Sequence, residues 1–175
     1  MFAVRRTNGG PKAKRNNLMA KKFTFSERQL KADARYGSKL VSKFINCLML
    51  KGKKSVAEQV FYSAMDIVSE KVKDAEPLEV FEKAVNNVRP LLEVRSKRIG
   101  GASYQVPMQV NPKRQQALAF RWIIQSARGK KGKPMCQRLA AELVDAFNEH
   151  GEAMTTRENV HRMAEANKAF ARFAW

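Results

Sequence analysis

The stretch VRSKRIGGASYQVP, Val94–Pro107, interrupts a chain whose other apolar residues repeat at helical spacing. Side chains on both sides of Gly100-Gly101 alternate with a period of two, which predicts two antiparallel strands joined by a tight turn. Pro107 cannot donate a ladder hydrogen bond, so its strand needs no further neighbour. We therefore expect a free two-stranded ribbon at about 92–110. Such a ribbon needs support from the rest of the protein, because an isolated hairpin is marginal in water.

Three helices are predicted before this ribbon. The first begins near Ser38 and ends at Gly52, because its apolar residues recur every three or four positions. A second opens at the capping box Ser55–Glu58, with Val56 counted on its inner face. Pro77 suits the first turn of a third helix, and Pro90 blocks its continuation.

Three more helices are predicted after the ribbon. Asn111-Pro112 opens the fourth, which runs through Arg128, and a fifth runs from about Pro134 to near Gly151. A capping box at Thr155–Glu158 opens a sixth, which continues almost to Trp175. The predicted fold is mainly α: a single-domain bundle of about six helices with one protruding two-stranded β-ribbon between the third and fourth. We place a basic, flexible N-terminal extension at 1–30 and the folded domain at 31–175.

The basic residues are strongly segregated along the chain. In total 34 Lys and Arg stand against 16 Asp and Glu, a formal net charge of +18. Residues 37–54 hold five lysines and residues 94–141 hold eleven basic residues, and neither segment contains an acid. Residues 55–93, in contrast, hold eight acids and four basic residues. A generally solvated basic surface would be more evenly mixed, so the pattern indicates a dedicated surface for a polyanion.

Other classes of protein have little support. No apolar run approaches the roughly 18 residues of a membrane span, and no secretory signal follows the basic N-terminus, so we expect a soluble, intracellular protein without a membrane partner. Cys47 and Cys136 form no metal-binding pattern and are expected to be small buried apolar residues. No nucleophile or metal cluster is visible, so we expect neither an enzyme nor a cofactor.

Three groups of cations are the candidates for binding the polyanion. Arg114, Arg121 and Arg128 share one face of the fourth helix, within roughly 60° at 100° per residue. Lys53 and Lys54 follow Gly52 in a turn before the second helix, where they can reach phosphates. On the ribbon, Arg95, Lys97 and Arg98 precede Gly100 and Gly101, which allow close backbone approach. A dimerisation arm is the other interpretation of the ribbon, although no homo-oligomer is expected.

Several motifs resemble one known family. They are the pattern Ser38-x-Leu40-x3-Phe44-Ile45-x6-Gly52-Lys53-Lys54-x5-Val60-Phe61-x2-Ala64, the runs AVNNVRPLLEVRSKRIGGASYQVP (84–107) and ALAFRWI (117–123), and the final RENVHRMAEANKAFARFAW (157–175). Together they are similar to the family of small-subunit ribosomal protein seven, of the bacterial type. The resemblance covers about residues 30–175. In the segment KADARY, Lys31–Tyr36, the chain departs from the family's commoner Pro-Asp-Pro.

The resemblance implies a structural constituent of the small ribosomal subunit in the cytoplasm. Such a protein binds the 3′ major domain of 16S rRNA, nucleates assembly of the subunit head and lies near exit-site tRNA and the mRNA path. It has neighbouring head proteins and a platform protein as partners. The implied rRNA-binding residues are Lys31, Arg35, Lys53, Lys54, Arg95, Lys97, Arg98, Lys113, Arg114, Arg121 and Arg128, and the tip near tRNA and mRNA is Gly100, Gly101, Ala102 and Ser103.

Two further interpretations come from other classes of protein. An architectural DNA-binding protein could lay a basic ribbon in the minor groove, but such arms usually carry an apolar wedge, and Gly100–Ser103 offers none beyond Ile99. A protein-interaction adaptor would explain the acidic second and third helices, but not the acid-free middle of the chain. Basic patches scattered over several elements favour the folded shape of RNA.

Overall fold

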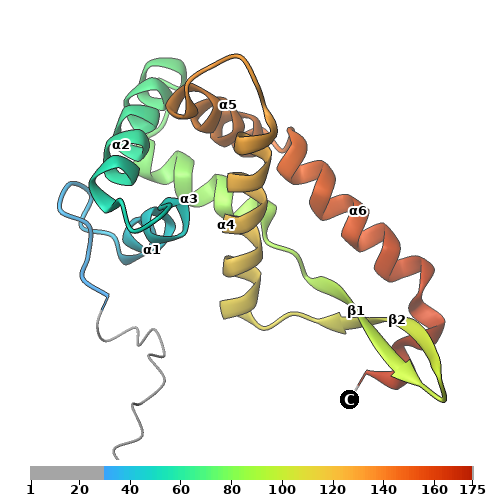
Figure 1. The fold of residues 1–175 in the computed structure, drawn as a ribbon. Coiled ribbons are helices and arrows are strands. Elements are labelled where there is room, and N and C mark those ends of the chain that lie inside the picture. Colours follow the sequence, from blue (N-terminus) through green and yellow to red (C-terminus); the bar gives the residue numbers. More distant parts are fainter. Residues whose placement is uncertain (1–29, 175) are drawn as a thin grey trace, which may run out of the picture. The chain divides into compact units, whose positions relative to one another are not determined.

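The computed structural model describes residues 30–174. The chain divides into two units, Met1–Lys31 and Ala32–Trp175. The second unit contains α1 (Lys39–Leu48), α2 (Lys54–Lys71), α3 (Pro77–Val88), β1 (Leu92–Ile99), β2 (Ala102–Gln109), α4 (Pro112–Gly129), α5 (Met135–Phe147), α6 (Glu152–Ala166) and the 3-10 helix η1 (Lys168–Phe173). The prediction of a mainly helical fold with one ribbon between the third and fourth helices is confirmed (Figure 1). No helix among residues 30–174 is long and apolar enough to cross a membrane. Residues 1–29 of the predicted extension lie outside the described part.

Four phenylalanines join the first four helices at the centre of the core. Phe44 of α1 lies 5.2 Å from Phe81 of α3 and 5.2 Å from Phe120 of α4, measured between ring centroids, and 5.6 Å from Phe61 of α2. All four side chains are fully buried. The Phe44–Phe81 and Phe44–Phe120 rings meet edge to face, an arrangement that stabilises a core beyond the area that the rings bury. The outer faces of α1 and α4 are therefore held in a fixed relation.

Two predictions about the core are wrong. Val56 is 51% exposed, because the buried side of α2 is formed by Ala57, Phe61 and the residues that follow them at helical spacing. Cys47 is exposed because it lies on α1 away from the buried Phe44 and Leu48. Cys136 is half-buried and packs against the core, which is closer to expectation.

Both predicted capping boxes are also wrong. The second helix begins at Lys54, before Ser55, and its N-cap Lys53 makes no side-chain capping bond. The sixth begins at Glu152 after Gly151, whose φ of 96° favours glycine. Thr155 therefore lies within the helix, and its hydroxyl donates to the carbonyl oxygen of Gly151 at 3.1 Å. In both cases the S/T-x-x-E pattern lies within the first turns of a helix and not at its start. A serine or threonine is tolerated there because its hydroxyl can donate to the carbonyl oxygen four residues earlier.

The ribbon has a two-residue turn and is supported from one side by the C-terminal segment. Ile99 pairs with Ala102, and Gly100 and Gly101 have φ values of 57° and 91°, the left-handed conformations that a tight hairpin turn requires. The sixth helix ends at Ala166, earlier than predicted, and η1 then turns back onto β2. The Tyr104 ring lies 5.1 Å from that of Phe170 and 6.0 Å from that of Phe173. The predicted need for support is thus met by aromatic packing.

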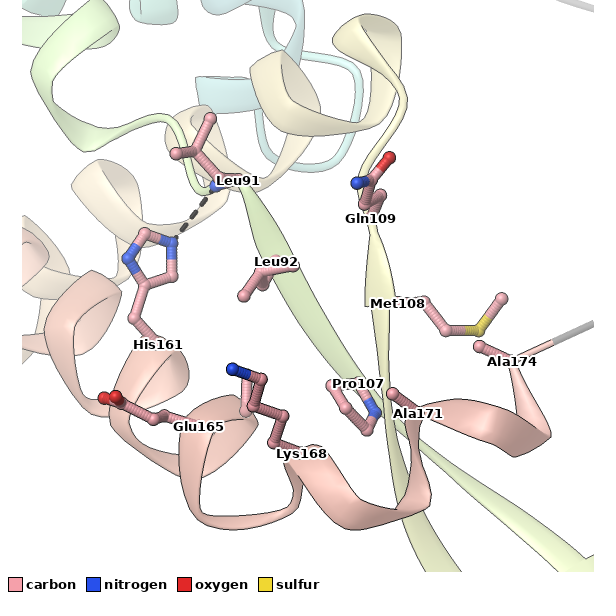
Figure 2. A pocket seen from close by; sticks show the side chains of 11 residues that line it. Leu91, Leu92, Pro107, Met108, Gln109, His161, Glu165, Lys168, Ala171 and Ala174 are labelled. Atoms are coloured by element: carbon pink, nitrogen blue, oxygen red, sulfur yellow. Dashed lines mark hydrogen bonds between the residues drawn. The ribbon is translucent and has the colours of Figure 1, made fainter.

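A histidine of α6 fixes the chain where it enters the ribbon. The backbone N–H of Leu91 donates to Nε2 of His161 over 3.1 Å (Figure 2). This bond requires a neutral imidazole with its Nε2 lone pair free. Burial, and secondarily the charge of Arg157, lower the pKa of His161, which favours that neutral form. The base of the ribbon is therefore joined to α6 by a bond that is sensitive to protonation.

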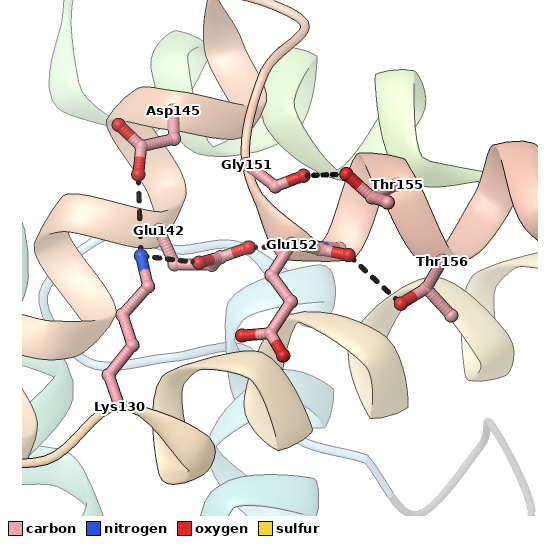
Figure 3. A network of polar contacts seen from close by, with 8 residues as sticks. Lys130, Glu142, Asp145, Gly151, Glu152, Thr155 and Thr156 are labelled. Atoms are coloured by element: carbon pink, nitrogen blue, oxygen red, sulfur yellow. Dashed lines mark hydrogen bonds and ion pairs between the residues drawn. The ribbon is translucent and has the colours of Figure 1, made fainter.

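A buried carboxylate connects the loop after α4 to the last two helices. Glu142 is fully buried, and its Oε1 accepts from the backbone N–H of Ala153 at 2.8 Å. Lys130 forms ion pairs with Glu142 at 2.7 Å and with Asp145 at 3.3 Å (Figure 3). Gly151 lies against this carboxylate, since a β-carbon there would meet Glu142 Oε1 at 3.2 Å. These contacts fix the start of α6, and with it the helix that supports the ribbon.

Candidate nucleic-acid interface

The outer faces of α1 and α4 form a common cationic surface. Partial burial raises the pKa of the Cys47 thiol, and the charges of Lys43 and Arg121 oppose this effect. Lys43 lies one helical turn before Cys47 on α1, and Arg121 is exposed on α4, which packs against α1. Arg128, two helical turns after Arg121 on the same face of α4, donates from Nη2 to the Leu48 carbonyl oxygen at 3.1 Å. We call Lys43, Arg121 and Arg128 the α1–α4 basic face.

The arginines predicted to share one face of α4 make different contacts. Arg121 is exposed, and so is Gln125 next to it. Arg114 is half-buried and binds Glu93 at the base of β1 through two hydrogen bonds, from Nε at 3.2 Å and from Nη2 at 2.8 Å. That acid stands one residue before the acid-free segment, so the segment's composition did not reveal it. Arg114 as an rRNA contact stays a prediction, but its charge is already matched within the protein.

The turn between α1 and α2 presents its lysines to solvent. Lys51 and Gly52 have φ values of 52° and 75°, and the Lys53 N–H donates to the Leu50 carbonyl oxygen at 3.0 Å. Lys53 is exposed at the N-cap of α2. Lys54 is also exposed, but it lies 3.5 Å from Glu58 in an i,i+4 pair. An exposed pair of this kind contributes little stability and leaves the lysine able to exchange partners.

The ribbon's cations are divided between its two faces. Strand alternation and register place Arg95 and Lys97 on the face of Tyr104, and Arg98 on the opposite face with Ser103. Lys97 donates from Nζ to the Phe173 carbonyl oxygen at 3.1 Å, so it also ties η1 to β1. Arg95 is exposed and lies 3.6 Å from Glu93. The four predicted tip residues, Gly100–Ser103, are all exposed.

The segment before α1 holds Arg35 against α2. Its guanidinium donates to Asp66 at 2.6 Å and lies 5.4 Å and 5.6 Å from the ring centroids of Tyr36 and Tyr62. Asp33 is buried and accepts from the Tyr62 hydroxyl at 2.8 Å. Burial raises the pKa of Tyr62 to about 12, and the bond to Asp33 adds to this effect. This cluster fixes the turn in the KADARY segment.

The remaining two predicted cations are exposed. Lys113 lies in the first turn of α4, and Lys31 is the last residue of the other unit. Sequence reasoning missed Lys43 as a member of the α1–α4 basic face. The available signal was its position four residues before Cys47 on the polar side of the first helix, in a segment without acids.

Comparison with known proteins decides the family. The family model described as Ribosomal protein S7p/S5e matches residues 20–168. The chain belongs to this family. A relative from Rhodopirellula baltica, named small ribosomal subunit protein uS7, is 58% identical over 155 residues, 88% of this chain and 99% of the relative. Relatives with the same name from Prosthecochloris aestuarii and Dictyoglomus turgidum are 59% and 55% identical, over 82% and 90% of this chain and 93% and 100% of their own lengths.

Membership of the S7p/S5e family makes the chain a ribosomal protein, which is a structural component in translation and not an enzyme. The resemblance found in the sequence is thereby confirmed, as is the expectation that no catalysis takes place. The match also gives the segregated charge a partner class, because the RNA of the ribosome is a polyanion. The individual residues assigned to that RNA remain predictions.

Proposed function

We propose that this chain is a constituent of the small ribosomal subunit that binds the 3′ major domain of 16S rRNA and nucleates assembly of the subunit head. The observation that carries this proposal is the α1–α4 basic face, where Lys43, Arg121 and Arg128 lie on two helices joined by the Phe44–Phe120 contact and by the bond from Arg128 to Leu48. Lysines and arginines on a rigid surface bind phosphates and release counterions. The names of the relatives support the assignment to the small subunit.

The arrangement favours simultaneous binding of several RNA helices. The α1–α4 basic face, the Lys53-Lys54 turn and the ribbon belong to different elements, so they can contact different parts of a folded RNA. A folded junction presents phosphates and 2′-hydroxyls in several directions, and proteins recognise it by shape. Each surface alone is expected to bind weakly, so folding of the junction and binding of the protein are coupled.

The ribbon tip is assigned to exit-site tRNA and the mRNA path. Gly100 and Gly101 have open space where a β-carbon would stand, and Ala102 and Ser103 are also small and exposed. A tip of this kind brings its backbone close to a nucleic acid without a large side chain between them. Neighbouring head proteins and a platform protein complete the proposed set of partners, and the cytoplasmic ribosome is the proposed location.

A salt titration tests the rRNA assignment. The full chain is bound to a transcript of the 3′ domain of small-subunit rRNA, with duplex DNA of equal charge as competitor. We expect tight binding that survives the DNA, with a salt slope reporting on the order of five to ten phosphates. Equal affinity for both polymers, lost together as salt rises, would favour an architectural DNA-binding protein instead.

Cys47 provides an independent test of where the RNA lies. Its exposed thiol, flanked by Lys43 and Arg121, should be alkylated in the free protein and protected in the complex with the transcript. Cys136 packs against the core and serves as the internal reference. Alkylation of Cys47 at an unchanged rate in the complex would remove the α1–α4 basic face from the interface.

A further inference from the structure

An apolar hollow lies beside the turn that carries Lys53. Leu50, Val56 and Met135 form part of its walls, and Lys53, Arg128 and Arg138 are the cations that line it. Its volume is about 330 Å³, at the lower end of the range of about 300–1,000 Å³ that holds small organic groups. Leu50 is 62% exposed and Val56 is 51% exposed. These two residues thus offer apolar area that the protein does not bury itself.

The cations of the hollow are held in place by backbone carbonyls. Arg128 donates to Leu48, at the end of α1. Arg138 donates from Nη1 to the Arg128 carbonyl oxygen at 3.3 Å and also to the carbonyl oxygen of Lys130. Its Nε is buried and has no hydrogen-bond partner within the described residues. An arginine bound to neutral carbonyls keeps its whole positive charge, so the hollow combines an apolar wall with uncancelled cations.

The charge and position of the hollow favour one class of occupant. Arg128 belongs both to the hollow and to the α1–α4 basic face, so the hollow continues the proposed rRNA surface. A nucleotide combines a flat, weakly polar base with phosphates on both sides, and proteins that recognise RNA commonly bind bases that have left their stack. Arginine guanidinium planes and apolar side chains both pack on base faces.

We propose that this hollow binds one unstacked nucleobase of the rRNA. The base packs against Leu50 and Val56, and its flanking phosphates lie on Lys53 and Arg128. This inference rests on the proposed function and adds to it an apolar contact at a defined place. The packing of the base on Leu50 and Val56 differs from the phosphate contacts, because it contributes affinity without releasing a counterion.

The double variant Leu50→Ala/Val56→Ala separates the apolar contact from the charged ones. Both side chains are half or more exposed, so thermal unfolding of the free protein should hardly change. The base can cover only the exposed half or so of the five carbons that the two substitutions remove. We therefore expect binding to the 3′-domain transcript to weaken about 10- to 50-fold, with an unchanged salt slope. Lys53→Met should lower the slope by somewhat under one phosphate. Leu91→Ala, at a side chain that is 68% exposed away from the hollow, is the matched control and should bind as the wild type does.

Base-specific chemical modification of the transcript gives a direct readout. The wild-type protein should protect one unpaired base that becomes reactive again with the double variant. Unchanged affinity and unchanged base protection in the double variant would overturn this inference while leaving rRNA binding intact, and would favour an acidic protein segment as the occupant. Failure of the wild-type chain to bind the transcript specifically would overturn the proposed function and this inference together.

Discussion

The pair between Glu93 and Arg114 allows a test of whether this arginine of α4 binds RNA directly or stabilises the folded protein. Arg114 makes two hydrogen bonds to the carboxylate, at 3.2 Å and 2.8 Å, and the two side chains are 39% and 17% exposed. Two-point bonds between charged groups are stronger than single neutral ones, but solvent screening reduces their net contribution. We expect Glu93→Gln and Arg114→Ala each to lower the free energy of unfolding by about 1 kcal/mol, and the double variant to lower it by little more.

Urea unfolding of the four proteins in this cycle measures the coupling, and salt titrations with the 3′-domain transcript measure the role in RNA binding. Because Glu93 already matches the charge of Arg114, Arg114→Ala should change the salt slope little in the wild-type background. It should lower the slope by about 0.9 when Glu93 is first replaced by Gln. A full loss of about one phosphate on Arg114→Ala alone, without coupling in stability, would refute this reasoning and restore Arg114 as a direct phosphate contact.

The pH dependence of the same pair follows from its hydrogen bonds. The bonds from Arg114 lower the pKa of Glu93 below its usual 4.5, more than burial raises it. Because the folded state holds the carboxylate ionised, the stabilisation is complete above pH 4.5 and is lost as the pH falls through the lowered pKa. Acid unfolding of Glu93→Gln should lack this component, and identical acid profiles for the two proteins would contradict the assignment.

Three further predictions concern the contacts that position the ribbon. Lys130→Met leaves the buried Glu142 carboxylate without its ion-pair partner and should cost on the order of 2 kcal/mol in urea unfolding, part of which Glu142→Gln restores. The wild type should lose stability as the pH falls below about 6.5 and through the lowered pKa of His161, because the folded state disfavours the charged imidazole. His161→Phe should remove this pH dependence. Gly100→Val strains a residue at φ 57° and should leave affinity for the transcript within about twofold while disturbing tRNA handling, so normal translation by reconstituted subunits would contradict the tip assignment.

The ribbon and the helix count could be predicted from the sequence because both rest on local periodicity. The two-residue turn followed from a glycine pair flanked by alternating side chains, and its positive φ values explain why glycine stands there. What supports the ribbon could not be predicted locally. Tyr104 contacts Phe170 and Phe173 only because the chain turns back after Ala166, and nothing in the period of the sixth helix shows this change of direction.

The predicted starts of α2 and α6 were wrong for a different physical reason. Ser55 and Thr155 each stand three residues before a glutamate, but this spacing occurs inside a helix as readily as at its start. The real start of α6 is set by Gly151, whose positive φ and closeness to Glu142 exclude a side chain. The bond from the Ala153 N–H to Glu142 then takes the place of a capping side chain. A long-range acceptor of this kind leaves no mark in the local sequence.

The candidate site was predicted as a list of charges, and the structure changes what each charge can contribute. Arg35 and Arg114 are matched by Asp66 and Glu93, whereas Arg128 is bound to the carbonyl oxygen of Leu48. A carboxylate partner cancels the positive charge that a phosphate would meet, but a carbonyl partner only orients it. Among residues of the same type, the salt slope should therefore depend more on Arg121 and Arg128 than on Arg35 and Arg114. Net charge indicated correctly that the partner is a polyanion. The ion pairs that form within the folded protein determine which cations remain available to bind that partner.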